Sequence, residues 1–346
     1  MENVAQNIKP LVLSQNKIPT PEIKRVISNT SSDYSSVNLS EFYEVPPIYT
    51  ATLNNVIFYP KYYSLFTKSR ELISQSVGHH NNPIKSEHFS LSNLYFGRLE
   101  RLSGTCTMIR STFTQKNHYH CLIDYIPRIY LLDQHEYNNQ EIKLLLCSLP
   151  TKTENFFLKK MLPENIKPMI VDPNKLYSLE RVIFPSMMTS QKIGYLPPLY
   201  VDYLMSKVAP LRKRNKKNRI FISRSKSRNR RILNENELMS LLEDYGFKKY
   251  YLEELSIEEE IELFYDAEAV ISPHGAGLAN LIFSSNIKVL ELFPKPEISF
   301  YYYFLCKSVN HDYHYWSNPK SLTKGRKNEN FTVNLSEISK YLKTFF

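Results

Sequence analysis

An apolar run, a tight turn of small residues and a second apolar run follow one another in AVISPHGAGLANLIF, residues 269–283. This order predicts a strand that passes into a helix through His274-Gly275-Ala276-Gly277. Glycines let a ligand approach the main chain closely, and the start of a helix leaves backbone N–H groups without partners. These donors and the positive helix end favour a phosphate or diphosphate. We therefore expect the turn to bind a nucleotide-linked substrate, although His274 could instead be a loop histidine that caps a backbone carbonyl.

Strand-like and helix-like segments alternate on both sides of this turn. In the second half we expect strands at residues 220–222, 249–251, 269–272 and 288–293, and helices at 234–245, 256–267 and 335–346. The helix starts carry an expected N-cap at Asn234 and an expected capping box of Ser256 with Glu259. In the first half we expect strands at 56–59, 104–110, 142–147 and 169–171, and helices at 119–132, 154–162 and 197–211. This alternation predicts an α/β fold in which helices wind around a parallel sheet.

Length and composition bound the class of protein. The 346 residues, 42% of them hydrophobic, are enough for two domains. No run approaches the ~20 apolar residues that span a bilayer, and no signal peptide is visible. The four cysteines show no C-x-x-C spacing, so we expect reduced thiols and a cytoplasmic protein.

The net charge of +10 has a local origin. Residues 212–231 contain eleven Lys or Arg and no acid, one more than the net charge, so the rest of the chain is close to neutral. A solvated linker is one interpretation of residues 212–219. A nucleic-acid surface is another, but Phe221 is the one aromatic residue there for base stacking. A third assigns Arg224, directly after a predicted strand, to phosphate binding, because ligands bind at the carboxyl ends of strands in open α/β sheets.

A histidine and an aspartate four residues apart mark the first half. His120 and Asp124 would share one face of a helix, where a carboxylate can fix the imidazole tautomer and raise its basicity. Pro127 disfavours a continuous helix through this segment. We expect His120 to act as a general base oriented by Asp124; a buried histidine that only supports the fold is the alternative. Neither His118 nor Cys121 has further ligands spaced to complete a zinc site.

Several segments together resemble glycosyltransferase family 61. They are IFISR (220–224), RRILNE (230–235), YGF (245–247), PHGAGLAN (273–280), VLEL (289–292) and, in the first half, NHYHCLIDYIPR (117–128). The resemblance covers about residues 100–315. This family includes bacterial capsular-polysaccharide proteins and eukaryotic xylosyl-, arabinosyl- and N-acetylglucosaminyltransferases. One departure is Glu260, where relatives often carry Gln.

The resemblance implies a GT-B-like fold, with two Rossmann-like α/β domains that face a cleft. We expect a polar arm (1–45), an acceptor-side domain (46–210), a basic linker (211–218), a nucleotide-sugar-binding domain (219–330) and a C-terminal helix (331–346). It also implies an inverting, metal-independent transfer, and the sequence contains no Asp-x-Asp triplet for a metal–diphosphate clamp. Glu291 could hold a ribose hydroxyl, or could be a surface glutamate at a strand end.

These inferences lead to one expected function with two alternatives. We expect transfer of a sugar from a UDP-linked donor to a glycan or glycoconjugate hydroxyl in surface or capsular polysaccharide synthesis. No cofactor, metal or nucleic acid is expected, and a peripheral contact with the inner face of a membrane that carries a lipid-linked acceptor is a further expectation. A nucleotide-sugar epimerase or hydrolase on the same scaffold is one alternative, since fold does not fix function. A nucleic-acid or anionic-surface binding protein that acts through residues 212–231 is the other.

Overall fold

The fold is known from a computed structural model. The structure describes residues 7–12, 17–19, 42–44, 48–77, 94, 97–111, 117–134, 137–189, 194–294, 299–318 and 329–346. The expected arm over residues 1–45 therefore lies mostly outside the described residues. The parts of it that are described are strands β1 (Asn7–Val12), β2 (Lys17–Pro19) and β3 (Phe42–Glu44).

Two compact units make up the chain. Unit 1 consists of Met1–Asn16 and Val45–Gln191, and unit 2 of Lys17–Glu44 and Lys192–Phe346. Helix α4 (Pro198–Val208) belongs to unit 2 by this division, whereas the expected boundary falls after residue 210. The two-stranded antiparallel pair β2–β3 is also part of unit 2.

Unit 1 is built on a seven-stranded sheet of mixed direction. Its order is β1-β4-β9-β6-β7-β8, with β5 paired to β4. Besides β1, the strands are β4 (Ile48–Tyr59), β5 (Ser64–Phe66), β6 (Leu99–Thr107), β7 (Ile142–Leu146), β8 (Ile166–Ile170) and β9 (Leu176–Pro185). Strands β9, β6, β7 and β8 run parallel, but β4 pairs antiparallel with β1, β5 and β9. A wholly parallel sheet is therefore wrong for this unit, because β4 runs against its neighbours β1 and β9 and returns through the 3-10 turn Pro60–Tyr62 as a hairpin with β5.

The helices of unit 1 follow the parallel strands. The segment after β6 forms a π-helix, η4 (His120–Tyr125), and then α2 (Arg128–Leu132), which packs on β4 and β9. Helix α3 (Lys152–Met161) follows β7 and begins with a capping box of Thr151 and Glu154. Arg128 is fully buried and donates to the carbonyl oxygens of Pro185 and Ile109, so it joins the ends of β9 and β6. Burial lowers the pKa of Arg128 to about 9.

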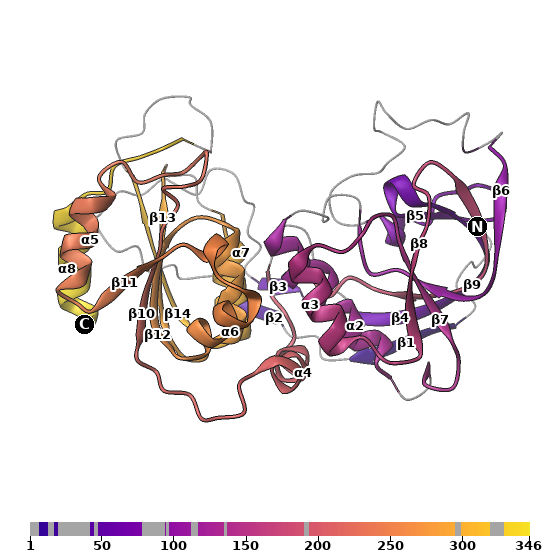
Figure 1. Cartoon of the computed structure of the whole chain (residues 1–346), viewed down its shortest axis with the longest axis horizontal. Coiled ribbons are helices and arrows are strands. Elements are labelled where there is room, and N and C mark those ends of the chain that lie inside the picture. Colours follow the sequence, from indigo (N-terminus) through magenta and orange to yellow (C-terminus); the bar gives the residue numbers. More distant parts are fainter. Residues whose placement is uncertain are drawn as a thin grey trace. The chain divides into compact units, whose positions relative to one another are not determined.

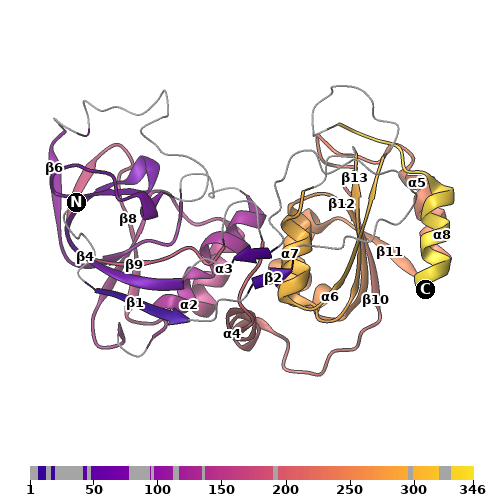
Figure 2. The same cartoon turned by 180° about the vertical axis from the view of Figure 1, so that it is seen from behind.

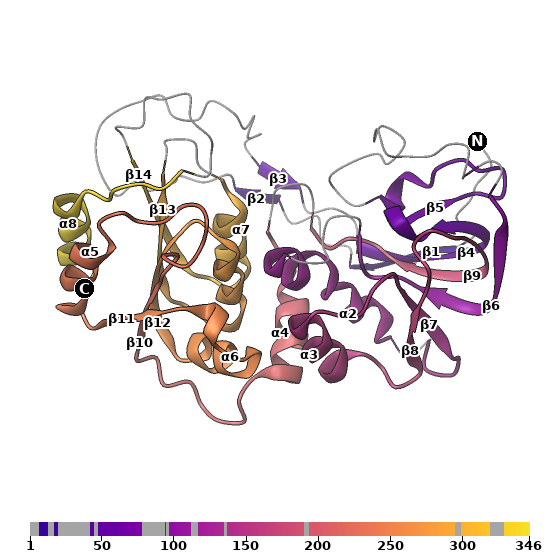
Figure 3. The same cartoon turned by 45° about the horizontal axis from the view of Figure 1, so that its top comes forward.

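Unit 2 contains a five-stranded, fully parallel sheet in the order β11-β10-β12-β13-β14. The strands are β10 (Asn218–Ile222), β11 (Phe247–Tyr250), β12 (Ala267–Pro273), β13 (Lys288–Phe293) and β14 (Asp312–Ser317). The helices are α5 (Glu235–Glu243), α6 (Ile257–Tyr265), α7 (Tyr301–Ser308) and α8 (Leu335–Phe345). Helices α5 and α8 cover one face of the sheet and α6 and α7 the other (Figures 1, 2 and 3). The predicted parallel sheet wound by helices is confirmed for this unit.

Alternate residues of the unit 2 strands enter two different cores. Phe221, Ile271 and Leu290 belong to the cluster shared with α5 and α8. Their neighbours Val270 and Glu291 lie on the opposite face, since side chains alternate across a strand. The side chain of Glu291 therefore lies on the face of the sheet that α7 covers.

The two helix-capping predictions for unit 2 have different outcomes. Ser256 and Glu259 form the predicted capping box of α6. Asn234 stands at the predicted N-cap position of α5, but its side chain exchanges two hydrogen bonds with the backbone of Val333 and does not bind the start of the helix. That partner is 99 residues away, so no local pattern could indicate it. The segment after the His274 turn is a 3-10 helix, η7 (Ala276–Phe283), rather than an α-helix.

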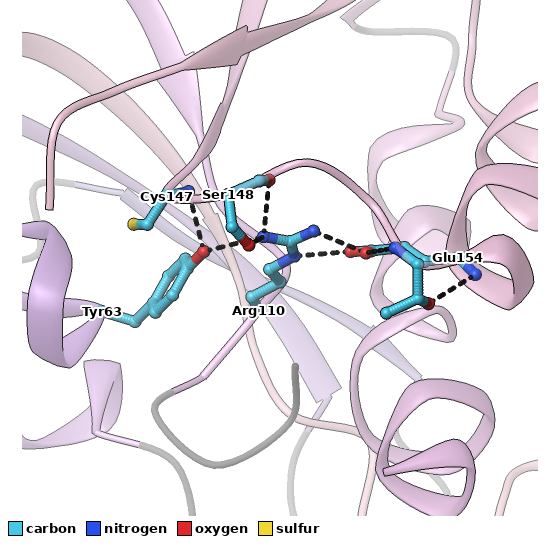
Figure 4. A network of polar contacts seen from close by, with 6 residues as sticks. Tyr63, Arg110, Cys147, Ser148 and Glu154 are labelled. Atoms are coloured by element: carbon cyan, nitrogen blue, oxygen red, sulfur yellow. Dashed lines mark hydrogen bonds and ion pairs between the residues drawn. The ribbon is translucent and has the colours of Figure 1, made fainter. Parts of the chain in front are cut away.

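A buried ion pair and its hydrogen bonds join four segments of unit 1 (Figure 4). Arg110, after β6, donates from Nε and Nη2 to the two carboxylate oxygens of Glu154 in α3, each at 2.5 Å. Its Nη1 donates to the Tyr63 hydroxyl at 3.2 Å and to Ser148, after β7, at 3.1 Å. The Arg110 and Glu154 side chains are 1% and 0% exposed. Burial alone lowers the pKa of Arg110, but the hydrogen bonds that it donates to Glu154 raise the pKa overall, so the guanidinium stays charged.

Removing the charge of Glu154 should therefore destabilise unit 1. We expect Glu154→Gln to lower the free energy of unfolding by about 3–5 kcal/mol, because it leaves a buried guanidinium without a carboxylate. Urea unfolding measures the difference, and Glu164→Gln, at an exposed glutamate, is the matched control and should cost less than about 0.5 kcal/mol. Equal losses in the two variants would contradict the role given to the ion pair.

Candidate functional site

The strand order of unit 2 reverses between β10 and β12. Strand β10 lies between β11 and β12, so the chain leaves β10 toward one edge of the sheet and later continues toward the other. In doubly wound sheets, ligands bind outside the carboxyl ends of the strands at such a reversal. Arg224 comes two residues after β10, and His274 directly follows β12. The structure therefore brings two sequence-predicted donor residues to this one place.

Gly275 makes room for Arg224. A Cβ atom on Gly275 would lie 2.3 Å from the Nη1 atom of Arg224, which is far inside contact distance. The backbone of Gly275 is extended, with φ at −179°, so the glycine matters for the space that it leaves to the Arg224 guanidinium and not for its conformation. The guanidinium reaches over the turn, and its Nε and Nη2 atoms lie 3.4 Å from the Asn229 carbonyl oxygen.

Arg230 is a second arginine at this site; the sequence placed it within the basic segment but did not single it out as a donor residue. It has a left-handed backbone, with φ at 59°, and its Nε atom is buried without a hydrogen-bond partner. Burial, followed by the charge of Arg230, lowers the pKa of Arg224, and burial also lowers the pKa of Arg230. Neither arginine forms an ion pair with a carboxylate among the residues that the structure describes. Two half-buried cations beside each other form a site suited to an anion.

His274 is held by a fully buried glutamate. Its Nδ1 atom donates to Glu291 Oε1 at 2.5 Å, and Tyr313 donates to the other carboxylate oxygen at 2.6 Å. Glu291 is 0% exposed and uses both oxygens inside the protein, which leaves it poorly placed for a ribose hydroxyl. The His274 ring also stacks on Phe293 at 5.2 Å. These contacts fix the ring and its tautomer, and leave Nε2 as the nitrogen available to a ligand.

The remaining turn residues have separate roles. Tyr302 of α7 donates to the Gly275 carbonyl oxygen at 2.6 Å and anchors the turn. Ala276 begins η7 and is half-buried. A Cβ atom on Gly277 would lie 2.8 Å from Leu252 Cδ1 and 3.6 Å from Ile222 Cγ2. The absence of a side chain at Gly277 therefore leaves space for packing toward the interior of unit 2. A substitution there would disturb this packing before it could report on the approach of a ligand.

The residues of the site that sequence reasoning missed are Arg230, Tyr302 and Tyr313. Arg230 lies within the RRILNE segment, and its pairing with Arg231 was a visible signal. The two tyrosines come from α7 and β14, more than 20 residues after the turn, and 25 tyrosines in the chain give no reason to select them.

His120 and Asp124 meet in unit 1 as their spacing predicts. His120 Nδ1 donates to Asp124 Oδ2 at 2.5 Å, and the Thr189 hydroxyl donates to Asp124 Oδ1 at 3.1 Å. The side chain of His120 is 18% exposed and that of Asp124 is 7% exposed. The pair stands on the π-helix η4, which ends just before Pro127, and single π-helical turns occur often at functional sites. The arrangement can orient His120 and accept a proton at its Nε2.

Three arginines of the basic segment are bound within unit 2. Arg212 pairs with Asp266 at 2.9 Å, and Arg219 pairs with Glu268 at 2.8 Å. Arg214 donates to the carbonyl oxygens of Tyr265 and Phe283, each at 2.8 Å, and so caps the ends of α6 and η7. A purely solvated linker is therefore wrong for these three residues, because their guanidinium groups hold helix ends and strand edges.

A buried carboxyl lies between α6 and η7. Glu260 is 6% exposed and accepts a hydrogen bond from the Asn280 side chain at 2.5 Å. Burial raises the pKa of Glu260 to about 7, although the bond from Asn280 acts in the opposite direction.

The profile of the family described as Glycosyltransferase 61 matches residues 118–290, half of the chain. The chain belongs to glycosyltransferase family 61. The matched range contains His120, Asp124, Arg224 and the His274 turn, and it ends one residue before Glu291. A comparison with curated proteins finds no match.

The described residues also bear on metal binding and on membrane crossing. No three His, Cys, Asp or Glu side chains in the described ranges group so that they could hold a metal ion. Within the same ranges, no helix has the length and apolar character needed to cross a membrane. The four cysteines carry free thiols.

The buried carboxyl of Glu260 should make stability depend on pH. Its pKa in the folded state is raised above the ordinary value of 4.5, so the folded state binds more protons and stability falls as pH rises from about 4.5 through about 7. Glu260→Gln keeps an acceptor for Asn280 and cannot ionise. We expect this variant to be more stable than the parent protein at pH 8, by on the order of 3 kcal/mol, with little difference at pH 4.

Thermal and urea unfolding at several pH values measure this difference. Glu258→Gln, at an exposed glutamate on the same helix, is the control and should leave the pH dependence of the parent unchanged. A pH dependence that survives in Glu260→Gln would contradict the assignment to this carboxyl.

Proposed function

We propose that the chain is an inverting, metal-independent glycosyltransferase that uses a UDP-linked sugar. As a member of family 61 it is a glycosyltransferase, and the proposal adds the donor, the stereochemistry and the acceptor. The acceptor is a hydroxyl of a glycan or glycoconjugate in surface or capsular polysaccharide synthesis, presented at a membrane. A GT-B-like arrangement of two α/β domains belongs to the same proposal.

The observation that carries the proposal is the pair of arginines at the strand reversal. Arg224 and Arg230 concentrate positive charge at the carboxyl ends of β10 and β12, next to a turn in which Gly275 has no side chain. A diphosphate provides two charged groups for two guanidinium groups, and arginine matches phosphate oxygens in a bidentate manner. The Nε2 atom of His274 offers a further contact to the same ligand, with Glu291 acting through His274 as a positioning residue.

The chemistry proposed is a single displacement. The acceptor hydroxyl oxygen attacks the anomeric carbon of the donor while the bond from that carbon to the β-phosphate oxygen breaks. The electron pair of the breaking bond passes to the diphosphate, where Arg224 and Arg230 stabilise the added negative charge. The acceptor proton passes to His120 Nε2, while His120 Nδ1–H remains bonded to Asp124. Attack opposite the leaving group inverts the anomeric configuration.

The donor site is tested by arginine substitutions in one short segment. We expect Arg224→Gln and Arg230→Gln each to weaken UDP binding by about tenfold or more, equivalent to about 1.4 kcal/mol, because each removes a charged contact to the diphosphate. Arg228→Gln, at an exposed arginine between them, is the matched control and should stay within about twofold. Calorimetric titration with UDP in EDTA measures all three.

Two results would contradict the donor assignment. Equal weakening in Arg228→Gln would mean that the segment acts as a diffuse cationic surface rather than as a site. A requirement for Mn²⁺ or Mg²⁺, seen as UDP binding that EDTA abolishes and the metal restores, would overturn the metal-independent mechanism.

The general base is tested separately. We expect His120→Ala to lower the rate of transfer by about 10²–10⁴-fold, because it removes the proton acceptor, and to leave UDP binding unchanged. Asp124→Asn should lose less, since it removes an orienting charge and leaves the imidazole in place. Initial rates of UDP release with a panel of nucleotide sugars and glycan acceptors measure both. Normal transfer by His120→Ala, with UDP binding intact, would exclude His120 as the base.

A further inference from the structure

Helix α4 and the segment that follows it carry both exposed leucines and exposed lysines. Helix α4 carries Leu199 in its first turn, 54% exposed, and Leu211 follows three residues after the end of the helix and is fully exposed. Lys207 lies in the last turn of α4, over the Tyr203 ring at 5.1 Å. We call α4 together with residues 209–217 the α4 surface. Figure 1 shows the chain passing from α4 to β10 without another helix or strand between them.

The charge of the α4 surface is positive and exposed. From residue 203 to residue 234 the chain contains no Asp or Glu. Arg212 and Arg214 are bound within unit 2, as described above. The side chains left at the surface are Lys207, Lys213, Lys216 and Lys217, all exposed. These four lysines surround Leu211 in the sequence at distances of two to six residues.

The combination of exposed leucines and exposed lysines bears on whether the partner is a nucleic acid or a membrane. Nucleic-acid surfaces interleave cations with exposed aromatic side chains on which bases stack. The aromatic residues of the α4 surface are Tyr200, which is buried, and Tyr203, which is half-buried, and residues 209–217 contain none. A fully exposed leucine beside lysines is instead typical of segments that insert an apolar side chain at the lipid boundary while cations contact anionic headgroups. We propose that the α4 surface docks this chain on a membrane that contains anionic phospholipid, with Leu211 inserted and the four lysines on the headgroups.

The docking surface deepens the proposed membrane contact and does not depend on the identity of the donor sugar. It would keep the enzyme beside a lipid-linked acceptor, and thereby raise the local acceptor concentration. Arg224 and Arg230 are not part of the surface, so membrane binding and UDP binding can be measured and lost independently.

Vesicle sedimentation of the full chain tests the proposal. We expect binding to vesicles of phosphatidylcholine with phosphatidylglycerol, and little binding to phosphatidylcholine alone. Leu211→Ser should weaken the partition by about tenfold, because it removes the inserted side chain. The combined replacement of Lys213, Lys216 and Lys217 by Gln should weaken it by about 100-fold at low salt, since each lysine near an anionic surface contributes about a tenfold effect or less.

Matched controls separate docking from unfolding and from general stickiness. Leu149→Ser, at a leucine of unit 1 that is 80% exposed, should bind vesicles as the parent does. All variants should keep the parent's melting temperature within about 2 °C and its UDP affinity, so that a failed donor assignment and a failed docking surface give different results.

Three outcomes would overturn the proposal. The first is equal binding to neutral and anionic vesicles, or to neither. The second is loss of binding in Leu149→Ser equal to that in Leu211→Ser. The third outcome combines two results. Single-stranded RNA binds the parent and Leu211→Ser equally but not the lysine variant, and Leu211→Ser binds vesicles as the parent does. Together these results would assign the surface to nucleic acid.

Discussion

The parallel pairing of β10 with β12 is the constraint on which the rest of unit 2 depends. Ile220 pairs with Val270 and Phe221 with Ile271, so the two strands end side by side. Arg224 and the His274 turn then start from adjacent strand ends. A slip of one residue in this register would turn the Phe221 side chain out of the core shared with α5 and α8. The packing that holds the sheet together therefore also determines that Arg224 lies over Gly275.

Each unit contains a histidine whose Nδ1 atom donates to a carboxylate at 2.5 Å. In unit 1 the carboxylate of Asp124 comes from the same π-helix, four residues away. In unit 2 the carboxylate of Glu291 comes from the neighbouring strand, and it is fully buried. In both pairs a hydroxyl group occupies the second carboxylate oxygen. Each carboxylate is thus held in place by a second hydrogen bond, which lets its histidine present Nε2 in one orientation.

The elements that could be predicted from the sequence are those whose determinants are local. The bounds of β13 and the capping box at Ser256 follow from residues a few positions apart. The His120–Asp124 pair also follows from spacing, but the π-helical form of its segment does not. The failures involve distant partners: the Asn234 side chain binds Val333, and the antiparallel pairing of β4 with β9 gives unit 1 a mixed sheet. Arg230 joined the site unpredicted, because its place depends on how the chain turns after β10.

The two arginines beside the His274 turn also have a consequence for turnover. Like charges held close together in a half-buried setting cost free energy, and any bound anion offsets that cost. A diphosphate does so whether or not it still carries a sugar. In the proposed reaction the released nucleotide carries more negative charge than the donor, so the two arginines should retain the product at least as tightly as the donor. Phosphate and sulfate in the buffer should act in the same way, as weak competitors that stabilise the fold while they slow the enzyme.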